Sequence, residues 1–215
     1  MLRATVKQVL RQMRVRGVPP PGLTEDIETA VRECARIFTP RRVIRRFGWN
    51  GREFSNGYAP RGNDILRHLS ACESVYLFAA TLGDMPDREC SRLMEQGSSY
   101  KAFMTDSIAA VMIENYCDDE CAALAVRESG TFTARFSCGY GDLPLGEQKE
   151  ICRMLDTPRT IGVHLSESGL LMPQKSVTAF IGRKNEGNGV IMKTCGNKCS
   201  ACDKKDCVYR AGGDE

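Results

Sequence analysis

The 215-residue sequence predicts an α+β fold, in which helices and strands are mixed without a regular β-α-β alternation. An apolar run of strand length at residues 75–82 lies among segments whose apolar residues recur at helical spacing, the longest at residues 107–127. Hydrophobic residues make up 42% of the chain and charged residues 27%, values near globular averages that exclude a wholly disordered or fibrous chain. A globular protein with its own core is therefore expected.

The N-terminal third is expected to hold two helices followed by a strand. Residues 1–16 and 24–38 each carry apolar residues on one helical face, and the Gly- and Pro-rich residues between them break the helix. Residues 41–47 hold four arginines among β-prone residues, which predicts a strand with one solvated face. An RNA or phosphate patch is the less favoured interpretation of this basic stretch.

The rest of the chain alternates between the two kinds of element. Asn-Gly steps predict tight turns before a short helix that opens at Asp64. Residues 86–128 return to a helical pattern that is interrupted near Gly97. A polar loop follows at 135–141, then a helix at 145–155, and then strands at 161–165 and 176–181 joined by a loop around Glu167. Residues 182–189 read as a linker.

Four of the eleven cysteines fall within a short C-terminal stretch, as Cys195, Cys199, Cys202 and Cys207. Four thiolates at this spacing can close around one Zn²⁺ or supply the four corners of an iron–sulfur cluster. The close succession of three cysteines and then a fourth favours [4Fe-4S]. Nearby lysines lower thiol pKa values and favour the thiolate. The other cysteines fit helical or apolar contexts as small hydrophobic residues.

Charge and hydropathy limit the function classes. The 30 Lys+Arg against 27 Asp+Glu give a net charge of +3, too weak to indicate a nucleic-acid binder. No apolar run reaches the length of a membrane span, and the N-terminal residues lack the apolar region of a secretory signal. A cytoplasmic protein is expected, in a reducing compartment where clustered cysteines bind metal.

Two segments carry a family resemblance when they are taken together. The first is Arg135-Phe-Ser-Cys-Gly-Tyr140-Gly, and the second is Ile161-Gly-Val-His-Leu-Ser-Glu-Ser168, followed by Met172-Pro173 and Ser176-Val177. With Gly62-Asn-Asp-Ile65 and the segment from Tyr76 to Gly83, they resemble the activation domain of cobalamin-dependent methionine synthase. The order of the blocks is the order in that family, and the match spans roughly residues 60–182.

The resemblance implies a fold and a function. The fold is a twisted antiparallel sheet flanked by helices, here with a small Cys-rich C-terminal tail. The function is reductive reactivation, in which S-adenosylmethionine and an electron convert cob(II)alamin to methylcobalamin. The cobalamin is carried by a partner, a separate cobalamin-dependent methionine synthase or related corrinoid protein. An electron donor of flavodoxin or ferredoxin type is implied, so the chain acts as a reactivation subunit of a methyltransferase.

The resemblance also places a binding site. Arg135 matches the residue that grips the carboxylate of S-adenosylmethionine, and a guanidinium suits that role because it binds carboxylates with two parallel hydrogen bonds. Tyr140 matches a residue lining the same pocket. Gly139 lets the backbone approach the ligand. The remaining candidates are an acidic helix position, a turn carboxylate and the two positions that replace an aromatic pair of the family: Glu114, Glu167, Ile181 and Gly182.

Three regions are expected: residues 1–60 as an N-terminal helical and strand extension, 60–185 as the activation-like core, and 190–215 as the Cys-rich tail. Two alternatives to the reactivation role stay open. In one, the chain is a non-catalytic module that clamps a corrinoid protein, with zinc holding its tail together. In the other, it is a redox protein with an iron–sulfur tail and no methyl chemistry.

Overall fold

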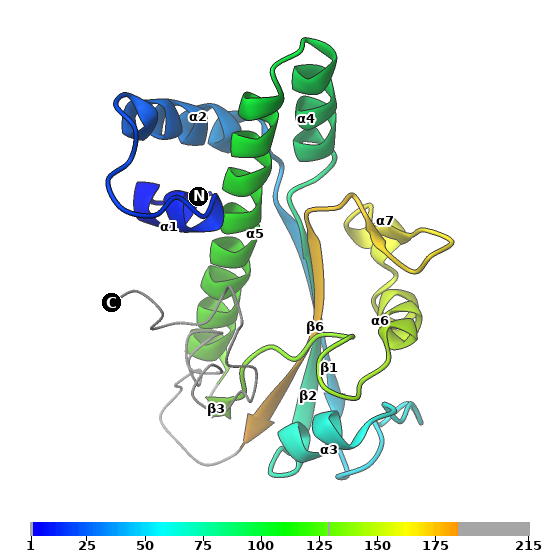
Figure 1. Cartoon of the computed structure of the whole chain (residues 1–215). Helices are drawn as coiled ribbons and strands as arrows, with labels where there is room; N and C mark the ends of the chain where they lie inside the picture. Colours follow the sequence, from blue (N-terminus) through cyan, green and yellow to red (C-terminus); the bar gives the residue numbers. More distant parts are fainter. Residues whose placement is uncertain (1, 129, 185–215) are drawn as a thin grey trace.

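A computed structural model describes residues 2–128 and 130–184 of the chain (Figure 1). The cysteine motif of the tail, Cys195, Cys199, Cys202 and Cys207, lies outside the described residues.

A four-stranded antiparallel sheet forms the centre of the molecule, with the strand order β1-β2-β6-β3. Strand β2 is buried along its whole length, because its side chains alternate between two apolar layers. Tyr76 and Phe78 join the core on one face, and Leu77 and Ala79 join the core on the other. The strands are β1 (Arg41–Gly48), β2 (Ser74–Thr81), β3 (Thr131–Phe132) and β6 (Ser176–Lys184).

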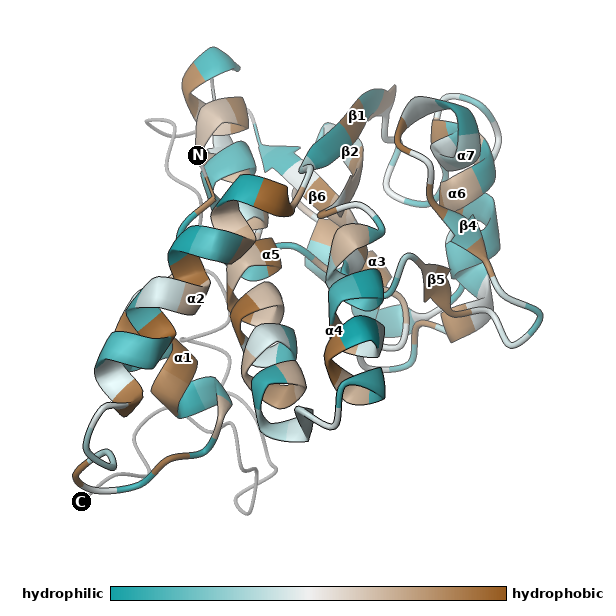
Figure 2. Cartoon of the chain, turned by 90° about the horizontal axis from the view of Figure 1, so that it is seen from above, coloured by the Kyte–Doolittle hydropathy of each residue, from teal (hydrophilic) through white to brown (hydrophobic). Residues whose placement is uncertain are grey.

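One face of the sheet is covered by the longest helix and three others, as Figures 1 and 2 show. Helix α5 buries Ile108, Met112 and Leu124 against the sheet and the neighbouring helices. Figure 2 shows that α2 turns a largely hydrophilic face outward, as an amphipathic helix on a core does. The helices of this layer are α1 (Val6–Gln12), α2 (Leu23–Ile37), α4 (Met85–Glu95) and α5 (Ser99–Arg127).

The other face carries a thinner layer of short elements. Ile151 and Leu155 of α6 pack with Val163 and with Phe180 of the sheet. A two-stranded hairpin, β4 with β5, lies next to α6 in this layer. The elements are α3 (Asn63–Leu69), the 3₁₀ turn η1 (Leu145–Glu147), α6 (Gln148–Leu155), α7 (Thr157–Thr160), β4 (His164–Leu165) and β5 (Leu171–Met172).

The predicted fold class is confirmed: an antiparallel sheet is flanked by helices. The strand prediction for the arginine-rich stretch is also confirmed as β1, an outer strand whose four arginines are exposed. The linker prediction is wrong for residues 182–184. They continue β6, because Gly182 and Arg183 pair with Val75 and Ser74 of the central strand.

Two helix boundaries also differ from the sequence pattern. Helix α5 begins at Ser99, well before the predicted start of the longest helix, because Gly97 turns the chain with a φ of +72° directly after α4. The segment predicted as one strand at 161–165 pairs only at its end, in β4. Among the described residues, no helix combines the length and apolar character needed to cross a membrane.

Candidate functional site

The segment after α5 returns to the sheet and fixes the position of Arg135. The backbone N–H and side-chain hydroxyl of Thr133 both bond to the backbone of Gly182, at 2.9 and 2.8 Å. Phe136 then exchanges two backbone hydrogen bonds with Phe180 of β6. Arg135 lies between these anchors, so its backbone is held at the sheet while its side chain reaches α5.

The guanidinium of Arg135 bridges two carboxylates of α5. It donates to Oε2 of Glu114 at 2.6 Å and to Oδ1 of Asp118 at 2.8 Å. Glu114 and Asp118 are four residues apart and so face the same side of the helix. The Arg135 side chain is 11% exposed, against 58% for Glu114 and 39% for Asp118. A largely covered cation thus stands between two carboxylates that water still reaches.

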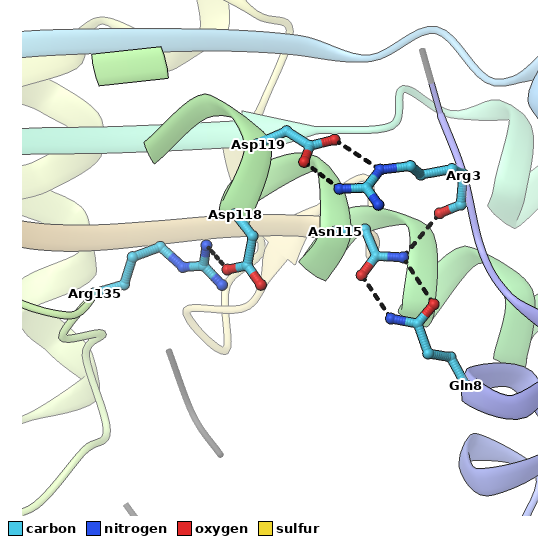
Figure 3. Close-up of polar contacts among 6 residues, drawn as sticks. All are labelled: Arg3, Gln8, Asn115, Asp118, Asp119 and Arg135. Carbon is cyan, nitrogen blue, oxygen red and sulfur yellow. Dashed lines mark hydrogen bonds and ion pairs between the residues drawn. The ribbon is translucent and has the colours of Figure 1, made fainter. Parts of the chain in front are cut away.

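The other acids of α5 have different partners. Arg3 pairs with Asp119 at 2.5 Å, and the amides of Gln8 and Asn115 bond to each other (Figure 3). On the side facing β1, Glu120 pairs with an arginine of that strand. With Asp106 paired to Lys175, the acids of α5 are divided among four basic residues, and Glu114 and Asp118 are the two that pair with Arg135.

Two thiols lie on the α5 face beneath this ion pair. Cys117 is fully buried and Cys121 nearly so, with the Cys121 Sγ 4.0 Å from Arg135 Nη1. Burial raises the pKa of both thiols above its ordinary value, although the nearby Arg135 opposes that shift. Both are accordingly neutral thiols near pH 7, so the negative charge around Arg135 comes from the carboxylates.

Residues 137–143 form a tight loop that presents Tyr140. The N–H of Gly139 bonds to the carbonyl of Leu143 at 2.9 Å, and the N–H of Tyr140 bonds to the carbonyl of Ser137 at 3.1 Å. Gly139 has a φ of +85° and Gly141 a φ of +52°, in the left-handed region that favours glycine. A Cβ at Gly141 would lie 2.0 Å from Oδ2 of Asp64, so this close approach also needs glycine.

Asp142 joins this loop to the start of α3. Its carboxylate accepts hydrogen bonds from the backbone N–H groups of Asn63 and Asp64, at 2.7 and 2.9 Å. The carboxylate of Asp64 accepts in return from the N–H of Asp142 at 3.1 Å. The N–H donors, that of Asp64 first, lower the pKa of Asp142. Two sequence blocks that carry the family resemblance are thereby bound to each other.

Two further rings form a packed group with Tyr140. The ring of Tyr140 meets the ring of Phe136 edge-on, with centroids 5.9 Å apart, and the ring of His68 in α3 lies 5.0 Å from that of Phe136. Nε2 of His68 lies 2.9 Å from the carbonyl oxygen of Ala134 and donates to it. Tyr140 itself is 42% exposed. The loop therefore offers a partly exposed aromatic surface next to the Arg135 segment.

The remaining candidates lie elsewhere. Glu167 is exposed in the β4–β5 turn, on the opposite side of the sheet from α5 (Figure 1). In this turn, the hydroxyl oxygen of Ser166 accepts a hydrogen bond from the backbone N–H of Leu170 at 3.1 Å. Ile181 is buried in the core against α5, and Gly182 has both backbone groups bonded to Thr133. A Cβ at Gly182 would lie 2.4 Å from the Sγ of Cys72, which shows close packing there.

The structure thus brings Arg135, Glu114, Gly139 and Tyr140 to one region and leaves Glu167 apart from it. The sequence analysis missed Asp118, Asp142 and His68. Asp118 stands one helical turn after Glu114, which is a signal available in the sequence. The roles of Asp142 and His68 depend on contacts with residues far away in the chain.

Comparison with known proteins finds similarity among the solved structures. No family model matches the sequence, and no curated protein matches it significantly. Among solved structures, the fold is similar to that of the MetH reactivation domain bound to AdoHcy, with a TM-score of 0.58. The alignment covers 86% of this chain and 78% of that one, at 13% sequence identity. At this identity, the likeness establishes the fold.

Proposed function

We propose that this protein binds S-adenosylmethionine at Arg135 and reactivates a separate cobalamin-dependent methionine synthase or related corrinoid protein. The single observation that carries the proposal is Arg135, which is largely covered and held between Glu114 and Asp118 in a fold shared with a reactivation domain. The neighbour's structure contains AdoHcy, the product of methyl transfer from S-adenosylmethionine.

The charges around Arg135 are complementary to an amino-acid group. S-adenosylmethionine carries a carboxylate and an ammonium on one carbon. The carboxylate takes the place of Glu114 on the guanidinium, and the released Glu114 receives the ammonium. Glu114 yields rather than Asp118 because it is the more exposed of the two partners. Asp118 then keeps Arg135 oriented during the exchange.

The loop supplies the second half of the site. Gly139 and Gly141 keep the backbone free of side chains where the ligand approaches, and Tyr140 lies beside the ligand with its hydroxyl toward it. When bound, S-adenosylmethionine supplies the methyl group, and one electron from a flavodoxin- or ferredoxin-type donor supplies the reducing equivalent. Cob(II)alamin, one electron and S-adenosylmethionine give methylcobalamin and S-adenosylhomocysteine. The chain contributes binding and orientation, which can provide most of the acceleration.

We assign Cys195, Cys199, Cys202 and Cys207 a separate role as ligands of a [4Fe-4S] cluster or a zinc ion. Four thiolates suit either one. A cluster would relay the electron, whereas zinc would hold the tail together. Anaerobic purification with iron, sulfide and zinc analysis distinguishes them. About four irons and four sulfides per chain support the relay, and one zinc without iron leaves an external donor as the sole electron source.

The test of the binding site is calorimetric titration of the full chain with S-adenosylhomocysteine. We expect Arg135→Gln to weaken binding by about tenfold to a hundredfold, since a hydrogen bond to a charged group is lost. Arg159→Gln is the matched control, because Arg159 is 86% exposed and lies in α7 on the opposite side of the sheet. Equal affinity of wild type and Arg135→Gln, or no binding by the wild type, would overturn the proposal.

A second measurement tests the reaction itself. Reduced electron donor, S-adenosylmethionine and a corrinoid protein in the cob(II)alamin state are mixed with the chain, and methylcobalamin is followed by its absorption spectrum. We expect formation to depend on the chain and to fall with Arg135→Gln. Binding of the corrinoid protein without any methylcobalamin would favour the clamp instead.

A further inference from the structure

A cavity of about 350 Å³ lies near the end of the sheet where β1 begins and β2 ends, and Arg135 does not line it. Its size is in the range of small-molecule sites. Four segments line it: the first residue of β1, the start of α4, the loop after α7 and the β4–β5 hairpin. The lining residues are Arg41, Asp84, Asp87, Ile161, Gly162, His164, Met172 and Pro173.

The cavity lining carries one guanidinium, that of Arg41. The guanidinium of Arg41 lies against Gly162, where a Cβ would stand 3.5 Å from Nη1 of the arginine. Gly162 has a φ of +74°, so both its conformation and its lack of a side chain leave the guanidinium accessible. Within residues 2–128 and 130–184, the Arg41 side chain makes no hydrogen bond or ion pair.

The lining also carries two carboxylates, and that of Asp87 is held in place. Oδ2 of Asp87 accepts a hydrogen bond from the backbone N–H of Gln174 at 2.9 Å, which places the carboxylate beside Pro173. Asp84 pairs with Arg88 at 2.8 Å, but both side chains are more than half exposed. Such a surface pair contributes little, so Asp84 remains available to a ligand.

The hairpin and the loop after α7 supply apolar side chains to the lining. His164 of β4 pairs with Met172 of β5. This pair lies close in the chain to Gly162 on one side and to Pro173 on the other. Ile161 is buried behind Gly162. The cavity lining therefore combines a cation, two carboxylates and apolar side chains.

This charge pattern selects among ligand classes. A phosphate needs converging cations, and the carboxylates of Asp84 and Asp87 oppose it. A metal ion needs several converging ligands, and no group of three His, Cys, Asp or Glu side chains in the described part of the chain is arranged to hold one. A zwitterion matches both signs of charge at once, and an α-amino acid carries its two charges on one carbon.

We propose that this cavity binds a free α-amino acid with an apolar side chain. The carboxylate binds Arg41, the ammonium binds Asp87 with Asp84, and the side chain lies along Ile161 and Met172. A bound amino acid would connect the start of α4 to the β4–β5 hairpin, which belong to the helix layers on opposite faces of the sheet. The proposal does not rest on the function assigned to Arg135.

The test is calorimetric titration of the full chain with L-leucine and with L-methionine. We expect binding that N-acetyl-L-leucine and L-leucinamide do not reproduce, because each analogue lacks one of the two charges. Arg41→Gln and Asp87→Asn should each weaken binding by at least about tenfold. The asparagine keeps an oxygen acceptor for the N–H of Gln174, so the local fold is preserved.

Two controls make the result specific to this cavity. Arg159→Gln should bind the amino acid as wild type does, since Arg159 is exposed and does not line the cavity. Arg135→Gln should also bind as wild type does, which separates this site from the proposed S-adenosylmethionine site. Loss of amino-acid binding in Arg135→Gln alone would assign it to that other site and overturn the proposal.

Three further outcomes would overturn the proposal. One is the absence of binding at amino-acid concentrations of about 10 mM, the weak limit of a specific small-molecule site. Another is equal binding of N-acetyl-L-leucine and L-leucine. The third is binding of Zn²⁺ or Mg²⁺ alone that is lost in Asp87→Asn, which would make the cavity a cation site.

Discussion

Asp64 and Asp142 bind each other's backbone: each carboxylate accepts a hydrogen bond from the N–H of the other residue, at 3.1 and 2.9 Å. The residues are 78 positions apart in the chain. This reciprocal pair attaches the Tyr140 loop to the first turn of α3, and the loop conformation at Gly141 depends on it.

Asp142→Asn is expected to destabilise the protein modestly, with an effect that disappears in acid. Backbone N–H donors lower the pKa of Asp142, so its stabilising contribution is present above the ordinary carboxyl pKa of about 3.9 and is lost as the pH falls through the lower, native value. Urea unfolding of wild type and variant should therefore converge on acidification. Glu28→Gln, an exposed change on α2, should show no such convergence.

Substitutions of Glu114 and Asp118 should have different effects on ligand affinity and on stability, although both residues pair with Arg135. Glu114→Gln removes the partner of the ligand ammonium and should weaken S-adenosylhomocysteine binding about fivefold to tenfold, with unfolding free energy within about 0.5 kcal/mol of wild type. Asp118→Asn should instead cost about 1 kcal/mol of stability, because it removes a partner of a largely covered guanidinium. Unchanged ligand affinity in Glu114→Gln would refute the proposal that Glu114 leaves Arg135 and receives the ligand ammonium.

Gly182→Ala should destabilise the sheet by about 1–3 kcal/mol through overpacking. The added Cβ would lie 2.4 Å from Sγ of Cys72 and 2.9 Å from Cδ2 of Leu69. Urea denaturation measures the loss, and the second change Cys72→Ala should restore part of it. Gly146→Ala, where a Cβ meets nothing within 4 Å, should be neutral or slightly stabilising. Equal stability of the Gly182 and Gly146 variants would contradict the packing at β6.

The buried thiols should make the protein less stable in alkali. Burial, with nearby Glu33 and Glu147 respectively, raises the pKa of Cys34 and of Cys138 to about 12. In the unfolded chain these thiols ionise near pH 8.5, so the stability they contribute is present below that pH and decreases as the pH rises above it. The urea midpoint of wild type should decrease between about pH 7 and pH 10, and Cys34→Ala should decrease less. Rapid alkylation of native Cys34 near pH 8 would show that the thiol is not buried.

The fold was predictable where a local pattern determines it. The apolar run of β2 and the β-prone residues of β1 identify strands without any knowledge of their partners. The end of β6 was not predictable, because Arg183 extends the strand by pairing with Ser74 and by an ion pair to Glu73, both far away in the chain. Local composition there indicated only a break in the apolar pattern.

The candidate site was likewise predictable only in part from the sequence. Arg135, Gly139 and Tyr140 lie in one short motif, whereas the ion pair between Glu114 and Arg135 joins residues 21 positions apart and was not predicted. Asp142 and His68 act on backbone groups 78 and 66 positions away, so only the folded chain reveals them. Glu167 belongs to the same resemblance, but its turn lies on the other face of the sheet.

Strand β1 leaves one backbone edge of the sheet without a strand partner among the described residues. Its arginines, Arg41, Arg42, Arg45 and Arg46, are exposed along that edge. If two copies approached edge to edge, their guanidinium rows would repel each other, and charged side chains on an edge strand are a known protection against such pairing. Repulsion between exposed charges extends about 10 Å at 0.1 M salt and shortens as salt is added. The tendency of concentrated protein to associate therefore depends on ionic strength, and a buffer of low ionic strength keeps the copies apart best.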